Sequence, residues 1–250
     1  MQMEGAVALV TGASSGIGAA AARRLAAAGC RILLLGRDAA RLDAVTRDVA
    51  GVPLVADLAA AGGPEDAAAR ARDALGHVDL LVNNAGVGWA GEFAAMPDAA
   101  IGDLVAANLL APVRLTRALL PAMVARGRGH IVVVSSIAGR TGVGGEAVYA
   151  ATKAAAGVFA DSLRYELAGT NVGVSVVVPG VVDTPFFGRR GVPYGRRWPR
   201  PIPPEQVADA IVRAVARERP EVFAPGWMRL PARLHGALPG LYRHLAGRFG

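Results

Sequence analysis

Short uninterrupted runs of apolar residues recur along the chain, separated by longer stretches with helical periodicity. An apolar run without polar alternation is typical of a strand buried on both faces of a sheet. The stretches between the runs are rich in Ala, Leu and Arg, which favour helices. The predicted strands are 6–10, 31–35, 52–56, 79–83, 130–134, 172–178 and 221–224, and the predicted helices are 17–28, 38–50, 64–75, 98–125, 148–168 and 204–218.

Strands that alternate with helices of this length predict βαβ units and a parallel sheet covered on both sides. We therefore expect one doubly wound α/β domain over residues 1–250, with about seven strands and a ligand site at their carboxyl ends. We expect helix 98–125 to break at Pro112, because proline removes a backbone donor. Neither a repeat nor a linker marks a second domain.

The last third of the chain has a different pattern. Residues 184–204 are rich in Pro and Gly and carry four aromatic side chains, which predicts a flexible substrate lid. Residues 226–250 alternate clusters of Leu and Arg, compatible with broken amphipathic helices. This basic C-terminal extension is expected to contact a membrane surface, to join subunits, or to cover the substrate pocket.

Composition excludes several classes of protein. A chain with 53% hydrophobic and 19% charged residues is neither disordered nor a coiled coil. The single cysteine, Cys30, cannot form an internal disulfide. We find no apolar run of the 18 residues that a membrane span needs and no signal-peptide pattern, so we expect a cytoplasmic protein. The four isolated histidines predict no metal site.

The net charge of +7 is unevenly distributed. Residues 1–185 carry 15 basic and 16 acidic side chains, whereas residues 186–250 carry 12 and 4, which gives −1 and +8. Arginines scattered among Leu and Pro are weak evidence for nucleic-acid binding, and we expect none. Of the 27 basic residues, 26 are Arg, and Lys153 is the only Lys. Because the chain uses Arg at every other basic position, the single Lys indicates a specific need for an ammonium group at position 153.

A glycine-rich turn, TGASSGIG at 11–18, joins strand 6–10 to the next helix. Glycines allow a tight turn and let backbone N–H groups and a helix N-terminus approach a pyrophosphate. The alternative is an ordinary strand–helix turn in a glycine-rich protein. The candidate phosphate-binding residues are Gly12, Ser14, Ser15, Gly16, Ile17 and Gly18.

Tyr149 and Lys153 lie four residues apart on a predicted helix, so their side chains share one face. A nearby ammonium should lower the pKa of a tyrosine from about 10 by about 3 units, which would suit general acid–base catalysis. Ser136 follows strand 130–134 and could donate a hydrogen bond to a substrate oxygen, with Ser135 pointing elsewhere. The alternative for Lys153 is a solvated helix charge.

These motifs together resemble the short-chain dehydrogenase/reductase family. TGASSGIG is followed in family order by NNAG at 83–86, Asn108, the serine pair 135–136, YAATK at 149–153, and Pro179-Gly180 with Thr184. The resemblance spans about residues 5–185 and implies a Rossmann-type fold, a nicotinamide cofactor and hydride transfer between an alcohol and a carbonyl. It implies a catalytic tetrad of Asn108, Ser136, Tyr149 and Lys153, with Tyr149 and Lys153 also contacting the cofactor. Further implied cofactor contacts are Arg37, Asp57, Leu58, Asn84, Ala85, Gly86, Pro179, Gly180, Val182 and Thr184, while Asn83 either braces the central strands or contacts the cofactor.

The end of the second strand indicates which nucleotide is bound. An acidic residue there binds the ribose of NAD, whereas an arginine accommodates the 2′-phosphate of NADP. Here the strand ends in Gly36 and Arg37, so NADP(H) is preferred, with a solvated Arg37 as the alternative. NAD(H) is still possible, because Ser15 stands where some NADP-specific relatives have a second basic residue.

We predict an NADP(H)-dependent oxidoreductase in which Tyr149 is the general acid/base. The substrate is expected to be a small apolar carbonyl or alcohol, because the candidate pocket residues are Val87, Trp89, Phe93, Phe186, Phe187, Tyr194 and Trp198. The resemblance also implies a homodimer or homotetramer that uses helices 98–125 and 148–168. The alternative is a non-catalytic nucleotide-binding regulatory or scaffold protein, against which the complete tetrad argues.

Overall fold

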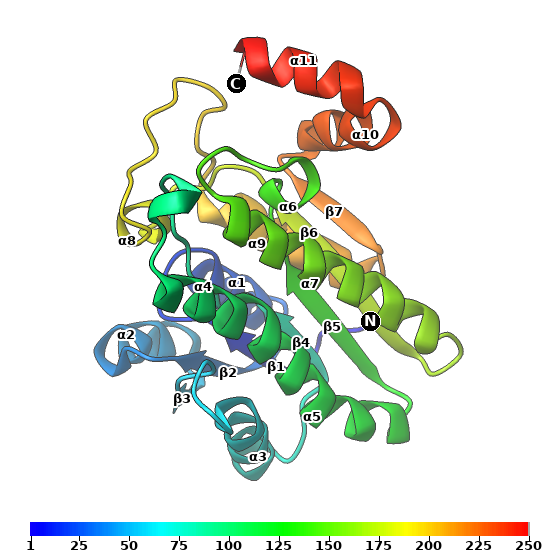
Figure 1. The fold of residues 1–250 in the computed structure, drawn as a ribbon. Helices are drawn as coiled ribbons and strands as arrows, with labels where there is room; N and C mark the ends of the chain where they lie inside the picture. Colours follow the sequence, from blue (N-terminus) through cyan, green and yellow to red (C-terminus); the bar gives the residue numbers. More distant parts are fainter. Residues whose placement is uncertain (250) are drawn as a thin grey trace.

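Seven parallel strands form one sheet in the order β3-β2-β1-β4-β5-β6-β7 (Figure 1). The structure is a computed structural model that describes residues 1–249, with side chains through residue 245. The predicted doubly wound parallel sheet is confirmed, and every strand lies within one residue of its predicted bounds. The strands are β1 (Val7–Thr11), β2 (Arg31–Gly36), β3 (Val52–Val55), β4 (Leu80–Asn83), β5 (Gly129–Val134), β6 (Val172–Pro179) and β7 (Glu221–Ala224).

Helices cover both faces of the sheet and enclose a separate apolar core on each side. One face is covered by α1 (Gly16–Ala27), α2 (Ala39–Val49) and α9 (Pro204–Ala216). The other is covered by α3 (Gly63–Leu75), α5 (Ala111–Ala125) and α7 (Ala147–Glu166). The run Ala19–Ala22 is buried, and its short side chains let α1 pack closely against the sheet and α9. Burial on both faces explains why the strands have no polar alternation.

The strand order reverses between β1 and β4. From β1 the chain winds outward to β2 and β3, and it then returns to β4 on the opposite side of β1. The loops that follow β1 and β4 therefore diverge above the sheet and leave a crevice at the carboxyl ends of these strands. The predicted phosphate-binding turn and the NNAG turn both lie at this point.

The predicted break at Pro112 is wrong. Helix α4 (Asp98–Val105) continues through a π-helical segment, Ala106–Leu110, directly into α5, and Pro112 lies in the first turn of α5. The wider π turn accommodates a proline that would disrupt an α-helical ladder. The resulting helix, Asp98–Ala125, is by length and composition apolar enough to cross a membrane, although charged residues interrupt its apolar run. Helices that pack on a core, as α5 does, also meet that criterion.

The lid segment 184–204 contains one short helix, α8 (Phe186–Arg189), and an isolated β-bridge from Ile202 to Val182, and α9 begins at its last residue. The C-terminal extension forms η3 (Gly226–Met228), α10 (Arg229–Ala237) and α11 (Pro239–Phe249), and Gly250 lies outside the described residues. In Figure 1 the yellow lid and the red C-terminal helices lie at the same end of the molecule. The remaining short elements are η1 (Phe93–Ala95) and α6 (Ala138–Thr141).

Candidate active site

A cavity of about 1550 Å³ lies at the carboxyl ends of the strands. Its wall runs from Arg37 after β2, past the turn after β1, to Tyr149 on α7 and on to the lid. Every predicted cofactor-binding residue lines this cavity except Gly18, and every member of the predicted tetrad except Asn108. The structure therefore brings together residues that are far apart in the sequence.

The glycine-rich turn is shaped for close contact. Gly16, the first residue of α1, has a φ of +54°, a conformation that favours glycine. A Cβ atom on Gly18 would lie 2.2 Å from the carbonyl oxygen of Gly12, so the helix can approach the turn only because position 18 is glycine. Gly18 thus has a packing role, whereas the N-terminus of α1 borders the cavity, where it can bind an anion.

Thr11 holds the turns after β1 and β4 together. Its hydroxyl accepts hydrogen bonds from the backbone N–H groups of Asn84 and Ala85, each at 2.9 Å. The Asn84 side chain in turn donates to the Thr11 carbonyl oxygen at 2.9 Å, so this amide braces the site. Asn83 is buried and donates to the Thr116 hydroxyl at 3.0 Å. This contact agrees with the first of its two predicted roles, bracing the central strands, rather than with cofactor contact. Sequence reasoning overlooked Thr11, although it opens the glycine-rich motif.

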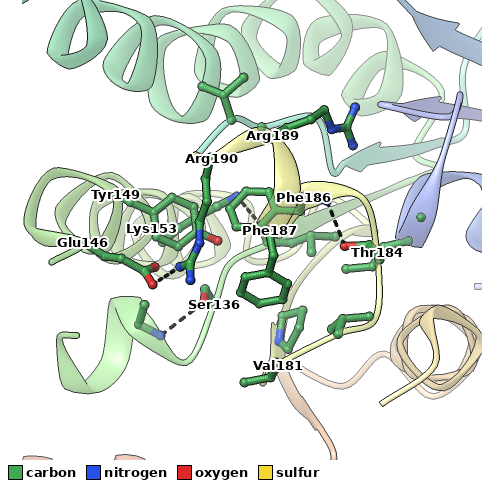
Figure 2. A pocket seen from close by; sticks show the side chains of 18 of the residues that line it. Ser136, Glu146, Tyr149, Lys153, Val181, Thr184, Phe186, Phe187, Arg189 and Arg190 are labelled. Carbon is green, nitrogen blue, oxygen red and sulfur yellow. Dashed lines mark hydrogen bonds and ion pairs between the residues drawn. The ribbon is translucent and has the colours of Figure 1, made fainter. Parts of the chain in front are cut away.

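Tyr149 and Lys153 both point into the cavity from α7, as Figure 2 shows, and are only 8% and 6% exposed. The Lys153 ammonium donates to the Val134 carbonyl oxygen at 3.0 Å and lies 5.9 Å from the Tyr149 ring centroid. It makes no other hydrogen bond within the described chain, which leaves two of its three N–H donors for a ligand.

Two consecutive serines after β5 have different tasks. Ser136 lines the cavity, and its hydroxyl oxygen accepts a hydrogen bond from the backbone N–H of Ala138 at 3.2 Å, which leaves its proton free to donate. The Ser135 hydroxyl donates instead to the Lys153 carbonyl oxygen at 2.8 Å and fixes α7 against β5. Ser135 thus points away from Ser136, as the extended backbone predicted.

Asn108 lies behind the cavity wall, in the π-helical segment. Its side-chain oxygen accepts from the Val87 N–H at 2.8 Å, and its amide donates to the Val87 carbonyl at 3.0 Å and to the Thr152 hydroxyl at 3.2 Å. A Cβ on Gly86 would lie 2.9 Å from the Asn108 oxygen and 3.4 Å from the Lys153 nitrogen. Asn108 therefore positions the loop after β4 next to Lys153.

We expected Lys153 to lower the pKa of Tyr149, but in the protein without a bound cofactor the pKa is raised. Burial raises the pKa of Tyr149 to about 12, an effect that the neighbouring Ser136 hydroxyl opposes. Burial also lowers the pKa of Lys153 to about 8. Loss of hydration in the cavity wall dominates both shifts, and for Tyr149 the Glu146 carboxylate adds to the rise while the Arg190 charge opposes it. Tyr149 is therefore a neutral phenol at pH 7.

Sequence reasoning missed an ion pair beside the predicted tetrad. Arg190, at the end of α8, pairs with Glu146 immediately before α7 (Figure 2), and their side chains are 7% and 14% exposed. No local signal could identify this pair, because its partners lie 44 residues apart and arginines are abundant in the lid. The pair joins the lid to the helix that carries Tyr149.

Aromatic side chains continue the cavity wall from Tyr149 into the lid. Ring centroids are 5.4 Å apart for Tyr149 and Phe186, and 5.6 Å apart for Phe186 and Phe187. Tyr194 follows at 5.4 Å from Phe187. Among the other predicted pocket residues, Val87 and Trp198 line the cavity, whereas Trp89 and Phe93 do not.

The C-terminal extension covers part of the same cavity, which was one of the three alternatives for it. Trp227 stacks on Trp198 of the lid with centroids 5.0 Å apart. Its other cavity-lining residues are Met228, Pro231, Tyr242 and Leu245. Within the described residues no group of three or more His, Cys, Asp or Glu side chains could hold a metal ion.

The crevice, the glycine-rich turn and the Tyr–Lys pair define a dinucleotide-dependent oxidoreductase of the doubly wound class. The family model described as short chain dehydrogenase matches residues 6–192. The chain therefore belongs to the short-chain dehydrogenase/reductase family, and the family predicted from its motifs is confirmed.

Two curated relatives match most of the chain. Dehydrogenase/reductase SDR family member 7B of Bos taurus is 34% identical over 259 residues, which cover 96% of this chain and 80% of the relative. Ketoacyl reductase HetN of Nostoc sp. is 36% identical over 231 residues, covering 88% of this chain and 79% of the relative.

Solved structures of the family superpose on the fold. A metagenomic short-chain oxidoreductase in complex with NADP has a TM-score of 0.76 and 38% identity, covering 89% of this chain and 98% of that chain. A short chain dehydrogenase/reductase from Burkholderia phymatum in complex with NAD has a TM-score of 0.86 and 25% identity, covering 94% of each chain.

Proposed function

We propose that the protein is an NADP(H)-dependent oxidoreductase that interconverts a carbonyl and an alcohol, with Tyr149 as general acid/base. The observation that carries this proposal is that Tyr149, Lys153 and Ser136 line the same cavity as the glycine-rich turn and Arg37. The residues fit a dinucleotide, because Lys153 retains free N–H donors for ribose hydroxyls and Gly86 leaves space beside it. The bound cofactor supplies or accepts a hydride at its nicotinamide ring.

In the direction of reduction, the Ser136 hydroxyl and the Tyr149 phenol both donate hydrogen bonds to the substrate carbonyl oxygen. As the hydride reaches the carbonyl carbon, charge develops on the oxygen, and Tyr149 gives it a proton, so that C=O becomes CH–OH. Lys153 stabilises the tyrosinate that remains. With a pKa raised to about 12, Tyr149 is protonated at neutral pH and so carries the proton that reduction consumes. Oxidation is the reverse.

The preference for NADP(H) rests on Arg37. This side chain lines the cavity at the end of β2, and within the described residues no carboxylate pairs with it. A free guanidinium at this position suits a bidentate contact with a 2′-phosphate. The solved relative with bound NADP supports this preference, and the relative with bound NAD is the reason to test both cofactors.

The substrate that we propose is an apolar carbonyl or alcohol compound. The aromatic wall from Tyr149 through Phe186 and Phe187 to Tyr194 supports an apolar occupant. The name of one relative, a ketoacyl reductase, supports reduction of a ketone on an apolar chain.

We also propose a cytoplasmic homodimer or homotetramer. Subunits would meet through the helix Asp98–Ala125 and α7, where Leu110, Val158 and Tyr165 are exposed. Size-exclusion chromatography with light scattering tests this assembly, and a monomer at micromolar concentration would contradict it.

The C-terminal extension is proposed to touch an anionic membrane surface at the mouth of the cavity. Exposed apolar side chains gather on it, and residues 184–204 and 222–250 contain no Asp or Glu. These side chains are Trp227, Leu230, Leu238, Leu241 and Leu245. Sedimentation with anionic and neutral vesicles tests the contact; no binding to anionic vesicles, or equal binding to both, would contradict it.

The test of the activity is a screen of ketones, aldehydes and secondary alcohols, following nicotinamide absorbance with NADP(H) and NAD(H). We expect reduction of apolar ketones or aldehydes with NADPH. If the protein binds NADPH but turns over no compound in either direction, the non-catalytic alternative is correct. Reduction that persists in Tyr149→Phe would contradict the assigned acid.

A further inference from the structure

Two consecutive arginines of the lid reach two different parts of the cavity. Arg190 pairs with Glu146 beside α7, as described above. Arg189 points away from that pair in Figure 2, and its guanidinium donates to the Ser15 hydroxyl at 3.2 Å. Ser15 belongs to the glycine-rich turn and lies 174 residues away in the sequence. The lid therefore places a positive charge at the phosphate-binding end of the cavity.

Arg189 lies among positive charges there. Arg37, Arg41 and Arg189 all line the cavity. Partial burial and the charges of Arg41 and Arg37 hold the pKa of Arg189 below its ordinary range. Arg41 pairs with Asp38 at 3.1 Å, whereas in the described part of the chain no carboxylate lies within 4.0 Å of Arg37 or Arg189. The hydrogen bonds of Arg189 go to two neutral acceptors, Ser15 and the Pro185 carbonyl.

Bringing like charges together costs free energy unless an anion compensates them. Arg189 is exposed, as are Arg197 and Arg200 of the lid, but its guanidinium reaches back to Ser15 in the glycine-rich turn. Two guanidinium groups without acidic partners in one cavity have the charge and the donors that suit a phosphate dianion. The local excess of positive charge therefore marks an anion site shared by the lid and the end of β2.

We propose that Arg189 is a second specificity-determining residue that binds the 2′-phosphate of NADP(H) together with Arg37. This inference rests on the proposed NADP(H) dependence and extends it from β2 to the lid. Arg189 contacts Ser15, the N-cap residue of α1, and its guanidinium also lies within the electrostatic influence of Arg37 and Arg41. Because Arg37 and Arg41 belong to the β2–α2 connection and α2, the 2′-phosphate is favoured over the pyrophosphate. Arg189 therefore distinguishes NADP(H) from NAD(H), which lacks this phosphate.

The test compares binding by isothermal titration calorimetry rather than turnover. The ligands are NADPH, NADH and 2′,5′-ADP, and the variants are Arg189→Gln, Arg189→Lys and Arg37→Gln. Arg197→Gln is the matched control, because it removes the same charge from an exposed position in the same lid that does not line the cavity.

Loss of one charge-assisted contact should weaken binding of NADPH and of 2′,5′-ADP to Arg189→Gln by about tenfold or more, with NADH binding unchanged. Arg189→Lys should recover part of the affinity, and Arg197→Gln should bind all three ligands as the wild type does. Wild-type affinity of Arg189→Gln for NADPH, or equal losses for NADPH and NADH, would overturn the proposal.

The outcomes separate this inference from the function on which it rests. If the wild type binds NADPH no more tightly than NADH, both the proposed cofactor preference and the role of Arg189 are wrong. If the wild type prefers NADPH and only Arg37→Gln removes the preference, the proposed function stands and the role of Arg189 alone is wrong.

Discussion

Arg190 of the lid and Glu146 at the start of α7 form an ion pair that is almost entirely buried. Glu146 lies three residues before Tyr149, and the Arg190 guanidinium also stacks over the Phe187 ring at 4.6 Å. The ion pair thus joins the lid directly to the helix that carries Tyr149.

Glu146→Gln should lower the free energy of unfolding by about 3 kcal/mol, because it leaves the Arg190 charge buried without a counter-charge. The Michaelis constant for the substrate should rise more than kcat falls, since the residue holds the lid and not the reacting atoms. Urea denaturation and steady-state kinetics measure the two effects. The double variant Glu146→Gln/Arg190→Met should recover part of the stability; unchanged stability in Glu146→Gln would show that the pair contributes nothing.

Tyr149→Phe should reduce kcat by about 10²-fold or more, because the reaction loses its proton donor. The melting temperature should change little, since within the described residues the phenol oxygen donates no hydrogen bond to the protein. Tyr165→Phe is the matched control, because Tyr165 lies on the same helix and is 79% exposed. Steady-state rates of NADPH oxidation measure the effect, and equal activity of the two variants would contradict the assignment.

Arg37→Asp should raise the Michaelis constant for NADPH far more than that for NADH, because the carboxylate repels a 2′-phosphate and suits ribose hydroxyls. Arg47→Asp on α2 is the control, since it makes the same charge change at an exposed position that does not line the cavity. Kinetics with the two cofactors measure the ratio. Equal increases of the Michaelis constant for NADPH and NADH would show that Arg37 does not bind the 2′-phosphate.

His130 should make the protein labile to acid. Burial lowers the pKa of His130 to about 4 from an ordinary 6.5, and its ring nitrogen hydrogen-bonds the Ser175 hydroxyl at 2.8 Å. Between pH 6.5 and 4 the unfolded chain binds a proton that the folded protein does not, so the free energy of unfolding falls as pH falls through this window. The whole contribution is about 3 kcal/mol.

Urea denaturation at several pH values measures this dependence. His130→Gln should lose less stability than the wild type between pH 6.5 and 4, while His244→Gln, at an exposed position, should follow the wild type. Identical pH dependence in the wild type and His130→Gln would show that His130 does not titrate in this window.

Local rules explain what the sequence could predict. The strands were recognisable because burial on both faces forces continuous apolar runs, and the Tyr149–Lys153 pair because a four-residue spacing fixes one helix face. The break predicted at Pro112 was wrong because the π-helical segment beside it depends on the packing of Asn108 against the loop at Val87. No local sequence pattern indicates this packing.

Long-range contacts account for the rest. The direction of the Tyr149 pKa was wrong because it depends on how deeply the phenol is buried, which spacing on a helix does not reveal. The contact between Arg189 and Ser15 could not be predicted either, because Ser15 carries no charge and Arg189 comes from the lid, 174 residues later in the sequence. Such partners are brought together only by the folded chain.

Because Lys153 is the only lysine and lines the cavity, chemical labelling of this residue can report on whether the cavity is occupied. An amine-directed acylating reagent therefore meets one lysine side chain, and the amine of Met1 forms an ion pair with Glu218 at 2.9 Å. With a pKa of about 8, a substantial fraction of Lys153 is the nucleophilic free amine in mildly alkaline solution. The extent of acylation, read by mass spectrometry, would therefore report directly whether a dinucleotide shields the cavity.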